Sequence, residues 1–139
     1  MSTNTITSIH QGGMNFTTSV KGHNMVIDLP EHEGGKNLGS SPKVLMLVSL
    51  AGCTGLDVVS ILKKQRVVFS DLSITVHAHV TEEDPKIYDD VSLLYKIKVA
   101  GKDEQKVLKA VELSQNKYCG VSEMFRAFAK LSFTIEFMR

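Results

Sequence analysis

The two cysteines are the residues of this sequence that can take part in the most kinds of reaction. Cys53 lies within the longest apolar run, SPKVLMLVSLAGCTGLDVVSILKKQR, and Cys119 comes much later, just before a short apolar segment. A cysteine thiolate attacks peroxides and disulfides, and it can be oxidised to a sulfenic acid. Free cysteine is also among the most buried residue types and packs like a small hydrophobe. The residues alone leave both alternatives open, a redox pair or two packed thiols.

The residues around Cys53 are unusual for an apolar helix. Asp57 follows Cys53 by one helical turn, and an acid in apolar surroundings should have a hydrogen-bond partner. Gly52 and Gly55 bracket the cysteine, although glycine costs about 1 kcal/mol in a helix interior relative to alanine. We therefore expect another backbone or helix to approach closely there, the alternative being that the glycines are merely tolerated.

The remaining chemical groups point to no cofactor and no metal site. His77 and His79 share the polar face of one expected strand and form half a metal site, but no third ligand has a helpful spacing. The sequence also lacks a phosphate-binding glycine loop, a nucleotide-binding motif and a hydrolase triad.

Length and composition are typical of one soluble domain. The chain has 139 residues, of which 42% are hydrophobic and 22% charged, and its net charge of +1 argues against nucleic-acid binding. The first residues, MSTNTITSIHQG, contain no apolar segment like that of a secretory signal. We therefore expect a cytoplasmic protein, in which two cysteines are redox-active or incidental more often than structural.

The hydrophobic pattern predicts a flexible tail over residues 1–13 and a single α+β domain over residues 14–139. Alternation with a period of two predicts strands, and apolar residues at helical spacing predict helices. The expected strands are Met14–Val20, Met25–Leu29, Leu72–Thr81, Val91–Val99 and Phe133–Phe137, and the expected helices are Pro42–Lys64, Glu104–Lys117 and Val121–Phe128. This order favours antiparallel sheets wrapped around a long central hydrophobic helix.

The long apolar helix could also be read as a membrane span. Asp57 would cost roughly 2.5–3.5 kcal/mol near the centre of a bilayer, and the amphipathic strands that follow would have no hydrophobic partner. We therefore favour a helix buried in a globular core and no membrane association. A helix that is apolar on all sides needs more cover than these strands offer in one chain, which favours a homodimer.

Two segments, SSPKVLMLVSLAGCTGLDVVSILKK and ELSQNKYCGVSEMF, together with the element order, resemble the OsmC/Ohr family from about Met14 to Arg139. These are the osmotically inducible protein C and organic hydroperoxide resistance proteins. The resemblance implies an intertwined homodimer with two active sites at the dimer interface. It also implies that Cys53 is the peroxidatic thiol and Cys119 the resolving thiol. Organic hydroperoxides would be the substrates, and a lipoyl-type dithiol would be the reductant.

The sequence departs from the family where the thiolate should be stabilised. Active members pair an arginine of the N-terminal strands with a glutamate after the helix-starting proline, but this chain has no arginine before Arg66, and Lys43 follows Pro42. It is similar to a branch of the family that lacks this pair. The cations that could replace the arginine are Lys43, Lys21, His23 and Arg126.

Without such a cation, apolar surroundings raise the pKa of a cysteine and make it unreactive at neutral pH. Two functions therefore follow from the sequence. The first is a thiol-dependent peroxidase that uses Cys53 and Cys119. The alternative is a non-enzymatic protein of the same fold that binds a small apolar ligand or senses oxidants slowly through its thiols.

Overall fold

The computed structural model describes residues 2–139, which form two compact units. The first unit extends to Met46, and the second begins at Leu47. The single domain over residues 14–139 stays a prediction.

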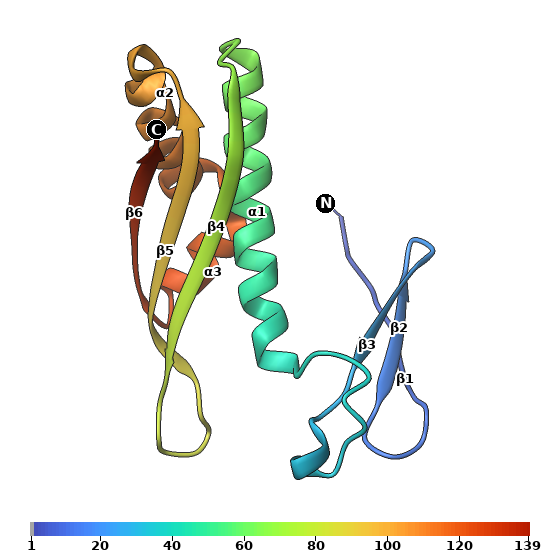
Figure 1. The fold of residues 1–139 in the computed structure, drawn as a ribbon. Coiled ribbons are helices and arrows are strands. Elements are labelled where there is room, and N and C mark those ends of the chain that lie inside the picture. Colours follow the sequence, from blue (N-terminus) through green and yellow to red (C-terminus); the bar gives the residue numbers. More distant parts are fainter. Residues whose placement is uncertain (1) are drawn as a thin grey trace. The chain divides into compact units, whose positions relative to one another are not determined.

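The first unit contains a three-stranded antiparallel meander (Figure 1). Its strands are β1 (Ser8–His10), β2 (Phe16–Val20) and β3 (His23–Ile27). Lys21 and Gly22 form the two-residue turn between β2 and β3, with φ values of 50° and 82° that a type I′ hairpin requires. Strand β3 therefore begins at His23, two residues before the predicted strand. The tail prediction is wrong for β1, which pairs with β2.

The segment after β3 is organised by a buried carboxylate. Asp28 accepts hydrogen bonds from the backbone N–H groups of Leu29, Lys36 and Leu38 at 2.7, 3.2 and 3.2 Å. Burial opposes its charge, but these three N–H groups lower the pKa of Asp28 below its usual range. The carboxylate thereby closes a loop around the short 3₁₀-helix η1 (Glu31–Glu33) that leads to the long helix α1 (Pro42–Lys64).

The second unit is built on a three-stranded sheet in the order β4-β5-β6. Strands β4 (Phe69–Val80) and β5 (Tyr88–Val99) pair antiparallel, whereas β6 (Lys130–Met138) pairs parallel to β5. The predicted α+β fold class is confirmed, but the expectation of antiparallel sheets does not hold for the β5–β6 pair. The physical reason is the helical connection between β5 and β6, which brings the chain back to the starting end of the sheet, as parallel pairing requires.

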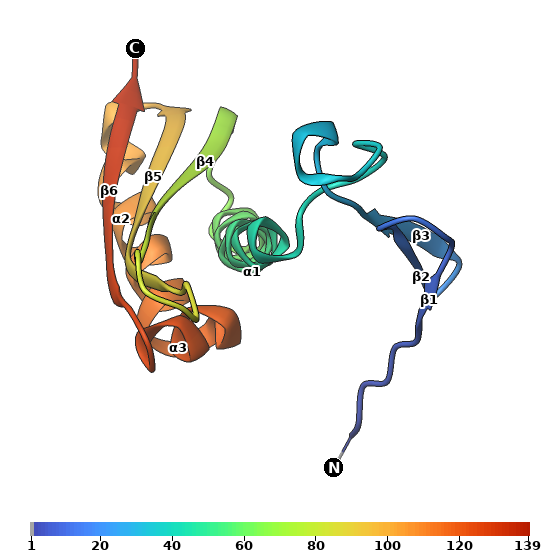
Figure 2. The same cartoon turned by 90° about the horizontal axis from the view of Figure 1, so that it is seen from below.

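That connection contains four short helical segments. They are the 3₁₀-helix η2 (Gly101–Asp103), α2 (Glu104–Leu113), the π-helix η3 (Ser114–Tyr118) and α3 (Gly120–Arg126). The sequence pattern predicted one helix from Glu104 to Lys117, and the π-helix replaces its last turn. Helices α1, α2 and α3 lie on the same face of the sheet (Figure 2).

The core of the second unit lies between this face and the helices. Strand β5 contributes fully buried alternate residues, among them Leu93 and Tyr95, as the period-two pattern predicted. Helix α1 contributes only one stripe at a spacing of four residues, which consists of Leu50, Thr54, Val58 and Leu62. This agrees with the expectation that the elements of a single chain do not cover an all-round apolar helix.

The opposite side of α1 is apolar and exposed. Val48 is 60% exposed and Leu56 74% exposed. The helix also has the length and hydropathy of a membrane span. The buried stripe of α1 belongs to the hydrophobic core of the second unit, so within residues 47–139 the helix is packed along one stripe and exposed along the other.

Candidate active site

The first cysteine is presented by the long helix α1. Cys53 is partly exposed, Thr54 beside it is fully buried, and Asp57 follows one turn later on the same side as Cys53. The buried stripe through Thr54 fixes the rotation of the helix, and this rotation places Cys53 and Asp57 at the border of the core.

The second cysteine is presented by the break between the π-helix and α3. The backbone N–H of Cys119 donates to the carbonyl of Ser114 at 2.8 Å, which closes the π-helix. Cys119 is then the N-cap of α3, where its Sγ accepts a 3.3 Å hydrogen bond from the N–H of Ser122. Its side chain is only 3% exposed, so its position is defined by contacts on all sides.

The fold brings these distant segments together at one point. The Sγ atoms of Cys53 and Cys119 and a carboxylate oxygen of Asp57 all lie within 4.8 Å of one another. Both thiols are free. The two sulfur atoms are thus no more than 4.8 Å apart, compared with about 2.05 Å in a disulfide bond.

The surroundings of Cys53 disfavour its thiolate. Burial raises the pKa of the Cys53 thiol above its ordinary value, and the N–H of Val121 lowers it by a hydrogen bond. The side chain of Cys119 raises the pKa further, both as a hydrogen-bond partner and as a nearby charge, and the negative charge of Asp57 adds to this. None of these influences is a cation.

A buried polar network fixes the other side of Asp57. The hydroxyl of Ser114 donates to Oδ2 of Asp57 at 2.9 Å and also lies 2.8 Å from the hydroxyl of Thr54. Thr54 is 2.6 Å from the Tyr95 hydroxyl, and the Gln115 amide donates to both, at 3.1 and 2.9 Å. The expectation that Asp57 has a hydrogen-bond partner is confirmed.

The residues predicted to stabilise a thiolate belong to different elements of the chain. Lys43 has an exposed side chain in the first turn of α1, ten residues or roughly 15 Å along the helix from Cys53. Lys21 and His23 belong to the first unit. Arg126 donates to Glu123 at 2.8 Å on the exposed side of α3. A thiolate-stabilising role for these four residues stays a prediction.

The two glycines beside Cys53 differ in what they face. A Cβ atom on Gly55 would meet the Ile74 side chain of β4 at 3.1 Å. A Cβ atom on Gly52 would meet nothing within 4 Å in the described residues. Among the described residues, the expected close approach of a backbone or helix is therefore found at neither glycine, and Gly55 faces the end of a side chain instead.

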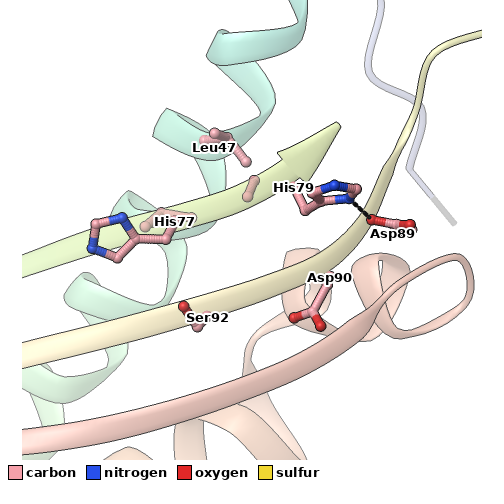
Figure 3. A pocket seen from close by; sticks show the side chains of 8 residues that line it. Leu47, His77, His79, Asp89, Asp90 and Ser92 are labelled. Carbon is pink, nitrogen blue, oxygen red and sulfur yellow. Dashed lines mark hydrogen bonds and ion pairs between the residues drawn. The ribbon is translucent and has the colours of Figure 1, made fainter. Parts of the chain in front are cut away.

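The two histidines of β4 line a separate hollow of about 740 Å³. His79 Nδ1 lies 2.7 Å from Asp89 Oδ1, and the ring of His77 is turned away from this pair (Figure 3). The hydrogen bond and the charge of Asp89 raise the pKa of His79. The exposed pair is thus an ordinary surface ion pair, and His77 adds no second ligand to it.

Sequence reasoning missed most of the groups that surround the thiols. Ser114, Gln115 and Tyr95 lie far from Cys53 in sequence, and nothing in their local pattern distinguishes them from ordinary helix and strand residues. The π-helix is the structural signal that could have been sought, because such turns often occur at functional sites. It turns both Ser114 and Gln115 into the core.

Comparison with known proteins agrees with this fold and site. A family model described as OsmC-like protein matches residues 34–134. Protein YhfA of Escherichia coli K12 is 30% identical over 118 residues, or 85% of each chain.

Solved structures show the same fold. An OsmC-like protein from Mycoplasma pneumoniae superimposes with a TM-score of 0.84 at 13% identity over 99% of both chains. An organic hydroperoxide resistance protein from Elizabethkingia anophelis gives 0.69 at 16% identity, also over 99% of both chains. The family model covers both cysteines and the elements that position them, and the chain belongs to the OsmC-like protein family.

Proposed function

We propose that this protein is a thiol-dependent peroxidase that reduces organic hydroperoxides through Cys53 and Cys119 and contributes to defence against oxidative stress. The observation that supports this most directly is the approach of the two Sγ atoms to within 4.8 Å from segments far apart in the sequence. The name of the Elizabethkingia neighbour, an organic hydroperoxide resistance protein, points to the same substrate class.

The proposed reaction has three steps that follow from sulfur chemistry. The Cys53 thiolate attacks the O–O bond of ROOH, which yields Cys53 sulfenic acid and, after protonation, the alcohol ROH. The Cys119 thiol then condenses with the sulfenic acid, which forms a disulfide and releases water. A dithiol reductant, of the lipoyl type in our proposal, exchanges with this disulfide, is itself oxidised to a disulfide and restores both thiols.

The exposure of the two sulfurs supports this division of roles. Cys53 is partly exposed and can meet a substrate, whereas Cys119 is buried at the start of α3. The N–H groups of Val121 and Ser122 donate to Cys53 and Cys119 respectively, so each sulfur has a donor suited to an anion.

A homodimer is part of the proposal. Val48, Leu56, Leu72 and Ile74 line an apolar hollow of about 540 Å³ between α1 and β4. A second copy of α1 would cover this surface and exclude water from it. A cytoplasmic location would keep both thiols reduced between turnovers.

The test is peroxide consumption by the reduced full-length protein with cumene hydroperoxide and dihydrolipoamide. We expect the wild type to turn over, Cys53→Ser to be inactive, and Cys119→Ser to consume one equivalent and then stop. Ser73→Ala, a change on the exposed face of β4, is the matched control and should behave as wild type. Equal rates for wild type and Cys53→Ser would overturn the proposal.

A second function is favoured by one observation, the raised pKa of Cys53. A thiol that is mostly protonated at neutral pH reacts slowly with peroxide, which suits a thiol redox sensor better than a defence enzyme. Stoichiometric oxidation to the Cys53–Cys119 disulfide without sustained turnover in the same assay would identify this alternative.

A further inference from the structure

We propose that the reduced site binds one thiophilic divalent cation of the zinc class through Cys53, Cys119 and Asp57. The three side chains are the one group of metal-ligating residues in residues 2–139 whose donor atoms all lie within 4.8 Å of one another. Two thiolates and a carboxylate are a donor set that Zn²⁺ accepts, with Zn–S bonds of about 2.3 Å and Zn–O bonds of about 2.0–2.2 Å.

The geometry requires only a small adjustment. In a tetrahedral site, these bond lengths place two sulfurs about 3.8 Å apart and a sulfur and an oxygen about 3.5 Å apart. The donor atoms already lie within 4.8 Å. Cys53 and Asp57 are one turn apart on α1 and project to the same side, so rotation of these side chains toward Cys119 is the movement that the proposed site requires.

Each of the three proposed ligands already accepts a hydrogen bond, as ligands in protein metal sites commonly do. The N–H of Val121 donates to Cys53 and that of Ser122 to Cys119, and N–H groups of this kind stabilise metal-bound thiolates. The hydroxyl of Ser114 donates to Oδ2 of Asp57. Among the described residues, Ser114 is the one hydrogen-bond donor to this carboxylate, so its other oxygen is available to the ion.

The carboxylate side of the proposed site is open to solvent. Asp57 lines a hollow of about 450 Å³ together with Lys64 and Tyr118. Three protein ligands and one open position are the pattern of zinc sites that keep a water or an exogenous ligand. The two thiols lose their protons on binding, so each Zn²⁺ that enters releases up to two protons to the solvent.

The experiment uses chelator-treated, reduced full-length protein and titrates it with Co²⁺ and with Zn²⁺. We expect one ion per chain, near-ultraviolet thiolate-to-Co²⁺ charge-transfer bands, and displacement of Co²⁺ by Zn²⁺. Bound Zn²⁺ should release protons in weak buffer and protect Cys53 and Cys119 against alkylation until a chelator is added.

Variants separate this site from adventitious binding. Cys53→Ser and Cys119→Ser should each lose the charge-transfer bands, and Asp57→Asn, which keeps the shape and still accepts from Ser114, should weaken Zn²⁺ binding at least tenfold. Asp89→Asn is the matched control, because it removes an exposed carboxylate outside the site and should bind as wild type. Bands that are absent in the wild type, or affinity that is unchanged in Asp57→Asn, would overturn the proposal. Far-ultraviolet circular dichroism of each variant confirms the fold.

The binding site does not depend on the proposed peroxidase, since its readouts need no peroxide. One consequence does rest on that function. Because the ion occupies both sulfurs, one equivalent of Zn²⁺ should abolish peroxide consumption, and a chelator should restore it. Metal binding without any peroxidase activity would support the metal site and overturn only the proposed function. Peroxidase activity without metal binding would support the proposed function and overturn the metal site.

Discussion

The hydroxyl of Ser114 donates a 2.9 Å hydrogen bond to Oδ2 of Asp57, which fixes a carboxylate one helical turn after Cys53. The same hydroxyl lies 2.8 Å from Thr54, so the π-helix ties Asp57 to the buried centre of the unit. A negative charge is thereby kept beside a thiol that must ionise in order to react.

Removal of this charge should make Cys53 more reactive. Asp57→Asn keeps a side-chain oxygen that accepts from Ser114 but eliminates one of the influences that raise the pKa of Cys53. Since Asp57 is the weakest of those influences, we expect the rate of iodoacetamide labelling of Cys53 at pH 7.5 to increase by a few-fold. Labelling is measured in metal-free protein by mass spectrometry of the separate Cys53 and Cys119 peptides. Asp89→Asn is the control, and an unchanged rate in Asp57→Asn would contradict the prediction.

The pH dependence of Cys53 labelling has a definite direction. The thiolate is the reacting species, and burial together with Cys119 raises the pKa of Cys53. The fraction of thiolate is therefore lower than in a free thiol at the same pH. We expect the labelling rate of Cys53 in metal-free protein to keep rising with pH after that of glutathione has levelled off. A Cys53 labelling rate that levels off at a lower pH than that of glutathione would contradict this prediction.

Thr54 should matter for stability through its hydroxyl. It is fully buried and lies within hydrogen-bond distance of Tyr95, Ser114 and Gln115. Thr54→Val keeps the volume but leaves these groups with fewer partners, which should lower the free energy of unfolding by about 1–3 kcal/mol. Urea unfolding measures the change, and Thr75→Val on the exposed face of β4 is the matched control. Equal losses for the two variants would show that the network contributes nothing.

The strongly periodic elements of this fold could be predicted from the sequence. The alternation in β4 and β5 and the apolar run of α1 predicted elements with nearly correct bounds, because these patterns reflect burial on one side of each element. The parallel pairing of β6 could not be predicted in this way. An isolated strand carries the same pattern in either direction, and only the path of α2, η3 and α3 decides it.

The candidate site could likewise be predicted only in part. Cys53 and Cys119 could be selected from residue type and family resemblance, and Asp57 could be singled out by its cost in an apolar helix. The partners that fix them could not, since Tyr95, Ser114 and Gln115 meet Thr54 only after the sheet and the π-helix have formed. Val121 and Ser122 act through their backbone N–H groups, so their residue types do not indicate this role.

Leu56 provides a test of the proposed homodimer, because its side chain is 74% exposed in the single chain although it lies on the apolar helix α1. A monomer would tolerate Leu56→Lys with little loss of stability, as surface changes usually cost within about 0.5 kcal/mol. A dimer that buries Leu56 would lose about 1.5–3 kcal/mol of apolar burial and would also have to desolvate a charge, so its dissociation constant should rise at least about a hundredfold. We expect light scattering after size exclusion to give a dimer for the wild type and a monomer for Leu56→Lys. Val68→Lys is the matched control, because Val68 is 85% exposed and lies beyond the end of α1. A wild type that is monomeric at all concentrations, or a Leu56→Lys variant that dimerises as tightly as wild type, would show that this face of α1 is not the dimer interface.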